Sequence, residues 1–290
     1  MDKGNYPALY LDADKASNTA QSKYLNLVRA EYTLLFLAAV LGLQWYTSAY
    51  YDVGYALVFV LAATMLVVRS FKKPEQTWYR CRALAESVKT STWRYMMRAD
   101  PFLDAESIQE PRAEFRNYLR EILKANREVG EELASGSSAE DQVTHAMDQV
   151  RKRGIEERKQ YYKEYRIQEQ RDWYNRRARD NKKAFRRWVG VTLIVYVIAI
   201  LTVLIRITQP GWEHAPTDPL IVLAASLIGW MQIRKFSELA SSYTLTAHEI
   251  GITLNRLYEV ETENDFSEFV NESELAFSRE HTQWVARQHE

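Results

Sequence analysis

Apolar and polar residues are strongly segregated along this chain. Four blocks contain no Asp, Glu, Lys or Arg: residues 33–47, 53–68, 189–205 and 219–233. A helix needs about 20 residues to cross the hydrocarbon core of a bilayer, with a lower limit near 17. The blocks approach that length, and aromatic residues that suit a membrane interface extend the first two. The competing interpretation is that the blocks are buried helices of a soluble core.

The two ends of the blocks carry different charges. Basic residues follow the second block, precede the third and follow the fourth, whereas the short connections inside each pair are acidic, with Arg206 as their single base. Positive residues flank membrane spans on the cytoplasmic side. We therefore predict two hairpins whose turns point outward, with both termini in the cytoplasm. The spans are predicted at about 33–50, 51–69, 188–207 and 218–235.

The polar segments have the composition of helices. No proline occurs between Pro111 and Pro210, and good helix formers dominate residues 139–187. That segment either runs into the third span as one helix or folds back near Gly154. The Ser-rich stretch 134–141 marks a boundary, because Ser138 can cap a new helix. We therefore divide the chain into two hairpin units with the same order of elements, residues 1–134 and 139–290.

These patterns together predict the fold class. We expect an all-α membrane protein with four transmembrane helices arranged as two hairpins, and with long cytoplasmic helices.

Composition adds little about partners. The 290 residues include 38 Lys and Arg and 38 Asp and Glu, so the net charge is zero and does not favour nucleic acid. The basic run at 176–187 is attracted to anionic headgroups, and nucleic-acid binding is the competing interpretation of that run. We expect no nucleic-acid partner because the run adjoins a span. The acidic run at 259–274 either pairs with the basic helix or is a solvated face.

The sequence offers little catalytic chemistry. It has no Gly-rich phosphate loop, and residues 247–253 lack the second histidine of a zinc-binding His-Glu-x-x-His motif. Glu280 and His281 could act as an acid–base pair, although a packed or surface pair is the simpler interpretation. Cys81 is the single cysteine and cannot form an internal disulfide. We expect no enzymatic activity, no cofactor and no metal.

Polar side chains form a stripe along the third span. At about 100° per residue, Thr192, Tyr196, Thr202 and Arg206 lie within an arc of about 120°. Such groups either form bonds between helices or line a water-filled path. In the first case the hydroxyls bond to the fourth span, with Ser226 as the expected partner. The candidate pore-lining residues are Thr192, Tyr196, Thr202, Arg206, Gln44 and Ser226.

Four stretches of the chain resemble a known family. The segments YPALYLDADKASNTAQSKYLNLVRAEY (6–32) and WYRCRALAESVKTSTWRYMMRADPF (78–102) resemble one subtype of the SLATT domains. The segments ERKQYYKEYRIQEQRDWYNRRARDNKKAFRRW (157–188) and SREHTQWVARQ (278–288) resemble a second subtype. SLATT domains are two-span membrane domains associated with SMODS nucleotidyltransferases and SLOG sensors in bacterial conflict systems. The resemblance covers nearly the whole chain as a tandem pair.

The second subtype contains the motif YxxxRIxxQxxWY, which begins at Tyr162. Its spacing is helical, so we expect its residues to hold the connecting helix against neighbouring helices. The candidate packing or assembly residues are Arg166, Gln170, Trp173, Tyr174, Glu280 and Trp284.

The resemblance implies an oligomeric membrane effector of a bacterial anti-phage or conflict system, located in the inner membrane, that forms pores or permeabilises the membrane. The sequence carries no sensor domain, so the trigger is expected from a partner sensor or a nucleotide-second-messenger system. The other expected partners are membrane lipids and further copies of the chain. The alternative is a membrane scaffold or adaptor that recruits a cytoplasmic partner through its helices.

Overall fold

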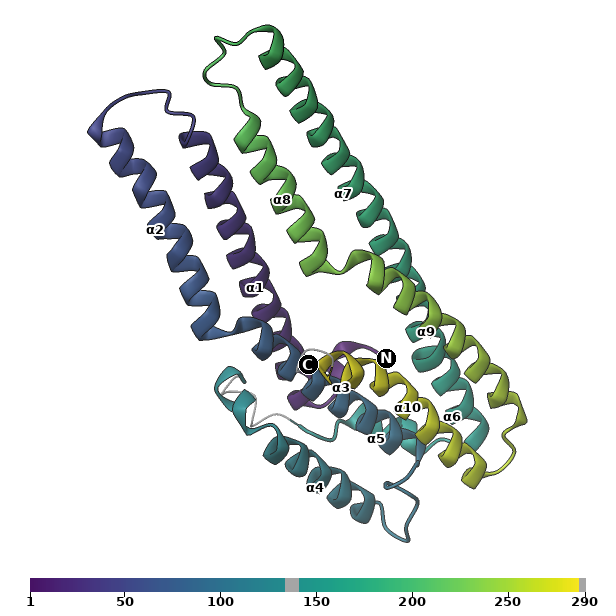
Figure 1. The fold of residues 1–290 in the computed structure, drawn as a ribbon. Helices are drawn as coiled ribbons and strands as arrows, with labels where there is room; N and C mark the ends of the chain where they lie inside the picture. The colour runs from purple at the N-terminus through teal and green to yellow at the C-terminus, as the bar shows by residue number, and fades with distance from the viewer. Residues whose placement is uncertain (134–140, 287–290) are drawn as a thin grey trace. The chain divides into compact units, whose positions relative to one another are not determined.

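The chain folds into helices that divide into two compact units. The computed structural model describes residues 1–133 and 141–286, with side chains up to residue 278, and these residues form no strand (Figure 1). One unit, here called the polar unit, contains Met1–Ser22, Pro74–Asp172 and Ala247–Glu290. The other, the span unit, contains Lys23–Lys73 and Trp173–Thr246. Each unit combines segments from both predicted hairpin units. The predicted Ser138 cap lies outside the described residues.

The span unit holds the four apolar blocks. Its helices are α1 (Ala8–Leu41) from Lys23 onward, α2 (Ala49–Lys72), α7 (Glu169–Thr208) from Trp173 onward, α8 (Thr217–Arg234) and the first part of α9 (Phe236–Arg256). Four helical stretches are long and apolar enough to cross a membrane, by length and composition. In Figure 1, α1 and α2 run in opposite directions, as do α7 and α8. The prediction of an all-α membrane protein is confirmed.

The first apolar helix ends earlier than the hydropathy pattern predicts. The predicted span continues to residue 50, whereas α1 ends at Leu41 and α2 begins at Ala49. Gln44 has a positive φ of 54°, which is incompatible with a continued helix. The Ser48 side chain accepts a hydrogen bond from the Tyr51 amide and so starts α2. The apolar residues after Leu41 therefore form the turn.

The second helix of each apolar pair ends at a lysine with a left-handed backbone. Lys73 follows α2 with a φ of 41°, and Lys235 follows α8 with a φ of 47°. This conformation costs an L-residue roughly 1–2 kcal/mol, and glycine is the usual residue there. A lysine instead places its positive charge at the negative end of the helix dipole. Corresponding positions in the two halves thus end a helix in the same way.

The polar unit is a helical bundle around α3 (Pro74–Met97). Its most extensive packing joins α3 to α10 (Glu263–Ala286), helices that lie far apart in the sequence. The remaining elements are η1 (Lys3–Asn5), the start of α1 up to Ser22, α4 (Gln109–Ala125), η2 (Arg127–Glu132), α5 (His145–Arg151), α6 (Ile155–Tyr162), a π-helical segment (Lys163–Gln168), the start of α7 up to Asp172, the end of α9 and η5 (Leu257–Glu259).

Of the two alternatives for the segment 139–187, the structure shows a break at Gly154. Gly154 adopts extended backbone angles, φ −63° and ψ 164°, and forms the N-cap of α6. From Ile155 the chain is helical through the π-helical segment into α7. The long helix therefore begins at Ile155 and ends at Thr208.

Aromatic rings form the core of the polar unit. Trp93 of α3, Tyr162 of α6 and Phe266 of α10 are fully buried. The Trp93 and Tyr162 ring centroids are 5.7 Å apart, and those of Tyr162 and Phe266 are 6.3 Å apart, both edge to face. Such pairs contribute beyond their buried area. The three helices are thereby packed into one core.

An ion pair lies inside this aromatic core. Arg166 of the π-helical segment donates to both carboxylate oxygens of Glu274 in α10, at 2.8 and 2.5 Å, and the Tyr162 hydroxyl donates to the same carboxylate at 2.8 Å. Arg166 and Glu274 are 2% and 0% exposed. Burial alone would lower the pKa of Arg166, but the Glu274 charge raises this pKa above its ordinary value. The buried guanidinium therefore depends on the Glu274 carboxylate for compensation.

Removal of one partner of this pair should be strongly destabilising. We expect Glu274→Ala to lower the free energy of unfolding by about 3–5 kcal/mol, because the buried Arg166 charge loses its counter-ion. The matched control is Glu272→Ala, two residues away on α10, which breaks the exposed pair with Arg256 and should cost less than about 1 kcal/mol. Thermal unfolding in detergent, monitored by circular dichroism, compares the two. Equal melting temperatures would contradict the role of the buried pair.

Candidate functional site

The surface of the span unit is the most unusual feature of the molecule. On α2 only Val58 and Ala62 are buried, and the described buried residues on the apolar part of α7 are Thr192, Val195 and Thr202. Soluble monomers rarely expose apolar patches above a few hundred Å². Lipid or other chains must cover these helices. The large exposed apolar residues of the two helices include Val53, Leu57, Phe59, Val60, Leu61, Leu66, Val67, Leu193, Ile194, Val197, Ile198, Ile200, Leu201, Val203, Leu204, Ile205 and Ile207.

The predicted polar stripe coincides with the packed face of α7. Thr192 and Thr202 are each 5% exposed, on the same side as Val195. Their hydroxyls donate to the carbonyls of Trp188 and Ile198, four residues earlier, each at 2.9 Å. The predicted stripe assumes that these hydroxyls need a partner from water or from another helix. That assumption is wrong, because the helix itself supplies the acceptors.

The other pore candidates lie at the edges of this face or beyond it. Tyr196 borders the face and is 43% exposed, and Arg206 is exposed near the end of α7. Gln44 is exposed in the turn after α1, and Ser226 is partly exposed on α8. The structure thus brings Thr192 and Thr202 into the protein interior and leaves Tyr196 and Arg206 at its surface.

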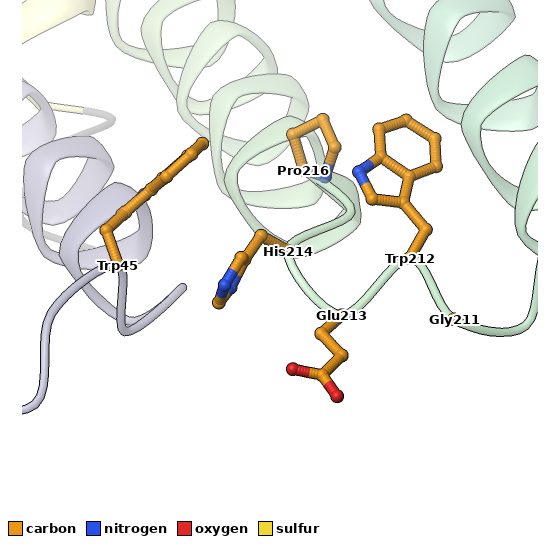
Figure 2. Close-up of a pocket in the computed structure, with 6 residues that line it drawn as sticks. All are labelled: Trp45, Gly211, Trp212, Glu213, His214 and Pro216. Carbon is orange, nitrogen blue, oxygen red and sulfur yellow. The ribbon is translucent and has the colours of Figure 1, made fainter.

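A pocket lies among the turns of the span unit, with a volume of about 420 Å³. Its lining is aromatic and includes one carboxylate, from Glu213, which Figure 2 shows pointing away from Trp212 and Pro216. The His214 and Trp45 rings stack with centroids 5.4 Å apart, and His214 Nδ1–H donates to the Leu43 carbonyl at 2.8 Å. Aromatic rings of this kind favour the membrane–water interface. The sequence signal for this pocket was the pair of tryptophans in two separate turns.

Several contacts connect the first apolar helix pair to the second. At the turns, Trp45 stacks on His214. Farther along, Tyr32 of α1 packs on Gly229 of α8, where a Cβ would collide with the Tyr32 hydroxyl. Small residues allow this type of close packing between membrane helices. The two helix pairs of the span unit are thereby joined through α1 and α8.

Charges are separated along the span unit. The turns and the helix starts beside them carry Asp52, Glu213 and Asp218, with Arg206 as the base. The opposite ends of α2 and α8 carry only basic residues, and we call this side the basic end. Its residues are Arg69, Lys72, Lys73, Arg234 and Lys235.

The motif residues of the connecting helix fall into both units. Arg166 is the buried partner of Glu274 in the polar unit, while Gln170 is partly exposed there. In the span unit Tyr174 is fully buried, and the Trp173 ring meets Tyr243 of α9 edge to face at 5.6 Å. Glu280 and Trp284 belong to α10, but their side chains lie outside the described residues.

Comparison with known proteins gives two matches to family models. Residues 7–159 match the model described as SMODS and SLOG-associating 2TM effector domain 3. Residues 162–284 match the model described as SMODS and SLOG-associating 2TM effector domain 1. No curated protein and no solved structure gives a significant match.

The approach of α1 and α8 at Gly229 can be tested by adding volume there. Gly229→Leu should force Tyr32 and α1 away and lower the free energy of unfolding by about 1–3 kcal/mol. Gly190→Leu, in the α-helix α7, is the control, because a Cβ there meets nothing within 4 Å. Both variants gain the same side chain and helix propensity. If they unfold at the same temperature in detergent, Gly229 is not a close-packing position.

Proposed function

Because this chain belongs to the family of SMODS and SLOG-associating two-transmembrane effector domains, with two subtypes in tandem, we propose that it is an oligomeric effector that permeabilises the membrane when a partner protein signals. The family description and the apolar helices make it a multi-pass membrane protein with effector domains. Permeabilisation, assembly and the signal are the parts that we propose.

The observation that carries the proposal is the exposed apolar surface of α2 and α7. A helix pair that only anchored a soluble domain would need lipid around it and nothing more. Here four apolar helices share few buried side chains, so much of their surface is free to meet further copies. Four spans are too few to enclose a wide channel, so several copies would assemble, with closed symmetry.

We propose α7 as the helix that lines the path. Within its apolar part, residues 189–207, Tyr196 and Arg206 are the exposed polar residues, and Thr192 and Thr202 lie on the adjoining face. Several copies of α7 around one axis would bring these residues together. Arg206 would then place a ring of positive charge at the turn side, and such rings favour anions. Movement of α7 against its packed face would bring the threonines to the path as well.

The charge separation supports an orientation in the bacterial inner membrane. The basic end faces the cytoplasm in this proposal, because Lys and Arg flank spans on that side. Both termini and the polar unit would then be cytoplasmic, where a partner sensor can reach them. The turn pocket would lie at the outer interface.

Ion selectivity tests the proposed path. In liposomes that contain the purified protein, we expect chloride to permeate better than potassium, and we expect Arg206→Glu to reverse this preference, since the ring of charge changes sign. The control is Arg120→Glu, which makes the same charge change at an exposed position on α4 of the polar unit and should leave the selectivity unaltered. Reversal potentials in a salt gradient give the permeability ratio.

Two outcomes would contradict this proposal. If the protein conducts but Arg206→Glu and Arg120→Glu behave alike, the path does not pass Arg206. If no conductance arises with the signalling partner present, the scaffold alternative replaces the effector. Single cysteines at 192, 196 and 202, with Cys81 replaced by serine, report independently. A water-soluble thiol reagent should label them only in the conducting state.

Orientation is tested by fusions. We expect a phosphatase reporter, active only outside the cytoplasm, to be inactive when fused after residue 290 and active when inserted beside Glu213, because the basic residues that flank the four spans lie on one side, with Arg206 as the exception. The reciprocal experiment uses a reporter that fluoresces only in the cytoplasm. An active phosphatase at the C-terminus would overturn the orientation.

A further inference from the structure

Three arginines gather at the basic end of the span unit. Arg29 of α1 and Arg234, the last residue of α8, both lie over the indole of Trp230, with guanidinium carbons 5.1 and 5.9 Å from the ring centroid. The third, Arg177 of α7, lies over Trp173 at 5.4 Å. Arg29 and Arg177 lie close enough to Arg234 for their like charges to act on it. Arginines from three helices thus lie near one another at this end of the span unit.

These charges lack a carboxylate partner among the described residues. None of the three arginines forms an ion pair there, although basic residues elsewhere in the chain do. The nearest acid in sequence to Arg29 is Glu31, whose carboxylate instead pairs with Arg69 at 3.2 Å. Arg29 is exposed and donates to Asn26 Oδ1 at 3.1 Å, an acceptor that carries no charge. Arg234 is half-buried, so solvent screens it less than a fully exposed arginine.

The aromatic rings compensate these charges only in part. A cation over a tryptophan face is stabilised, but the ring carries no negative charge to balance three guanidinium groups. Like charges held together repel each other unless an anion binds between them. Arginine presents a planar fork of donors that matches the oxygens of a phosphate. The arrangement is therefore complementary to a phosphate group.

From this geometry we propose that Arg29, Arg177 and Arg234 form a phosphate-binding site between α1, α7 and α8. Its place in the chain favours a lipid as the source of the phosphate. Arg234 ends an apolar helix, and Arg29 lies four residues before the first apolar block. Basic pockets between membrane helices bind anionic headgroups on the cytoplasmic side. Trp230 provides the aromatic residue typical of that interface. The inference does not depend on pore formation.

The site has a consequence for the connection between helices. One phosphate that contacts three arginines would join the first helix pair, through α1, to the second, through α7 and α8. Arg177 lies four residues after Trp173, which packs on Tyr243 of α9. Occupancy of the site would therefore also stabilise α7 near Trp173, where this helix enters the span unit.

Binding of a short-chain lipid to the full-length protein in neutral detergent tests the proposal. We expect dioctanoyl phosphatidylglycerol to bind, dioctanoyl phosphatidylcholine to bind at least tenfold more weakly, and Arg234→Gln to weaken phosphatidylglycerol binding about tenfold. Arg29→Gln and Arg177→Gln should act in the same direction. The matched control is Arg176→Gln, which removes an exposed charge one residue from Arg177 but about 100° around the helix. It should change the affinity less than about twofold.

Further measurements distinguish a lipid phosphate from a soluble phosphate and control for misfolding of the variants. Arg234→Lys keeps the charge but loses the fork, so it should weaken binding less than Arg234→Gln. Soluble glycerol phosphate that binds as tightly as the lipid, with the same dependence on the three arginines, would support a phosphate site filled from solution. Equal effects of Arg176→Gln and Arg177→Gln would overturn the site in favour of a solvated basic surface. Unchanged binding in all variants, with native melting temperatures, would overturn it as well.

Discussion

The buried contact between Arg166 and Glu274 constrains how the polar unit can be built. A charge in this core is tolerated only while its partner is in place. The chain between residues 166 and 274 must therefore bring α10 back into contact with the π-helical segment. Trp93 of α3 completes the surroundings, with its ring 5.9 Å from the Arg166 guanidinium. Trp93 lies in the first matched family domain and the ion pair in the second. The tandem domains therefore share one core, and neither contains a complete polar unit.

The π-helical segment lies where this constraint meets the continuous helix. Lys163–Gln168 carries Arg166 and is followed directly by α7. A π-turn takes in an extra residue, which rotates the next turns of the helix relative to a regular α-helix, and such turns are frequent at functional sites. Tyr162 and Arg166, four residues apart, lie on one face of this helix and reach the same carboxylate. A change in the bundle around Glu274 would act on the residues where the long helix leaves the polar unit.

Hydropathy and charge were sufficient to predict the helical class and the four apolar helices, because these depend on local composition. The sequence marked Gly154 as a possible break but left a continuous helix open, and the extended backbone angles of Gly154 decide between the two. The sequence could not show where the first helix ends, since that depends on the positive φ of Gln44 and on the Ser48 cap. It also misjudged the threonines of α7, because hydroxyl bonds to the preceding turn remove their need for an outside partner. Each unit combines segments from both halves of the chain. This arrangement depends on contacts between residues that are far apart in the sequence, such as Trp93 with Tyr162, and a single sequence carries no signal for such contacts.

Within the span unit, the contacts that join the two helix pairs are few and specific. Lipid tails are as apolar as leucine, so apolar contact alone gives little net attraction between membrane helices. Close packing and polar contacts must provide it, and they occur at Gly229 with Tyr32, at His214 with Leu43, and where Arg29 and Arg234 share Trp230. Each contact involves one or two side chains, and none resembles the shared aromatic core of the polar unit. The packing between the helix pairs therefore depends on these few positions, whereas the polar unit depends on a continuous aromatic core.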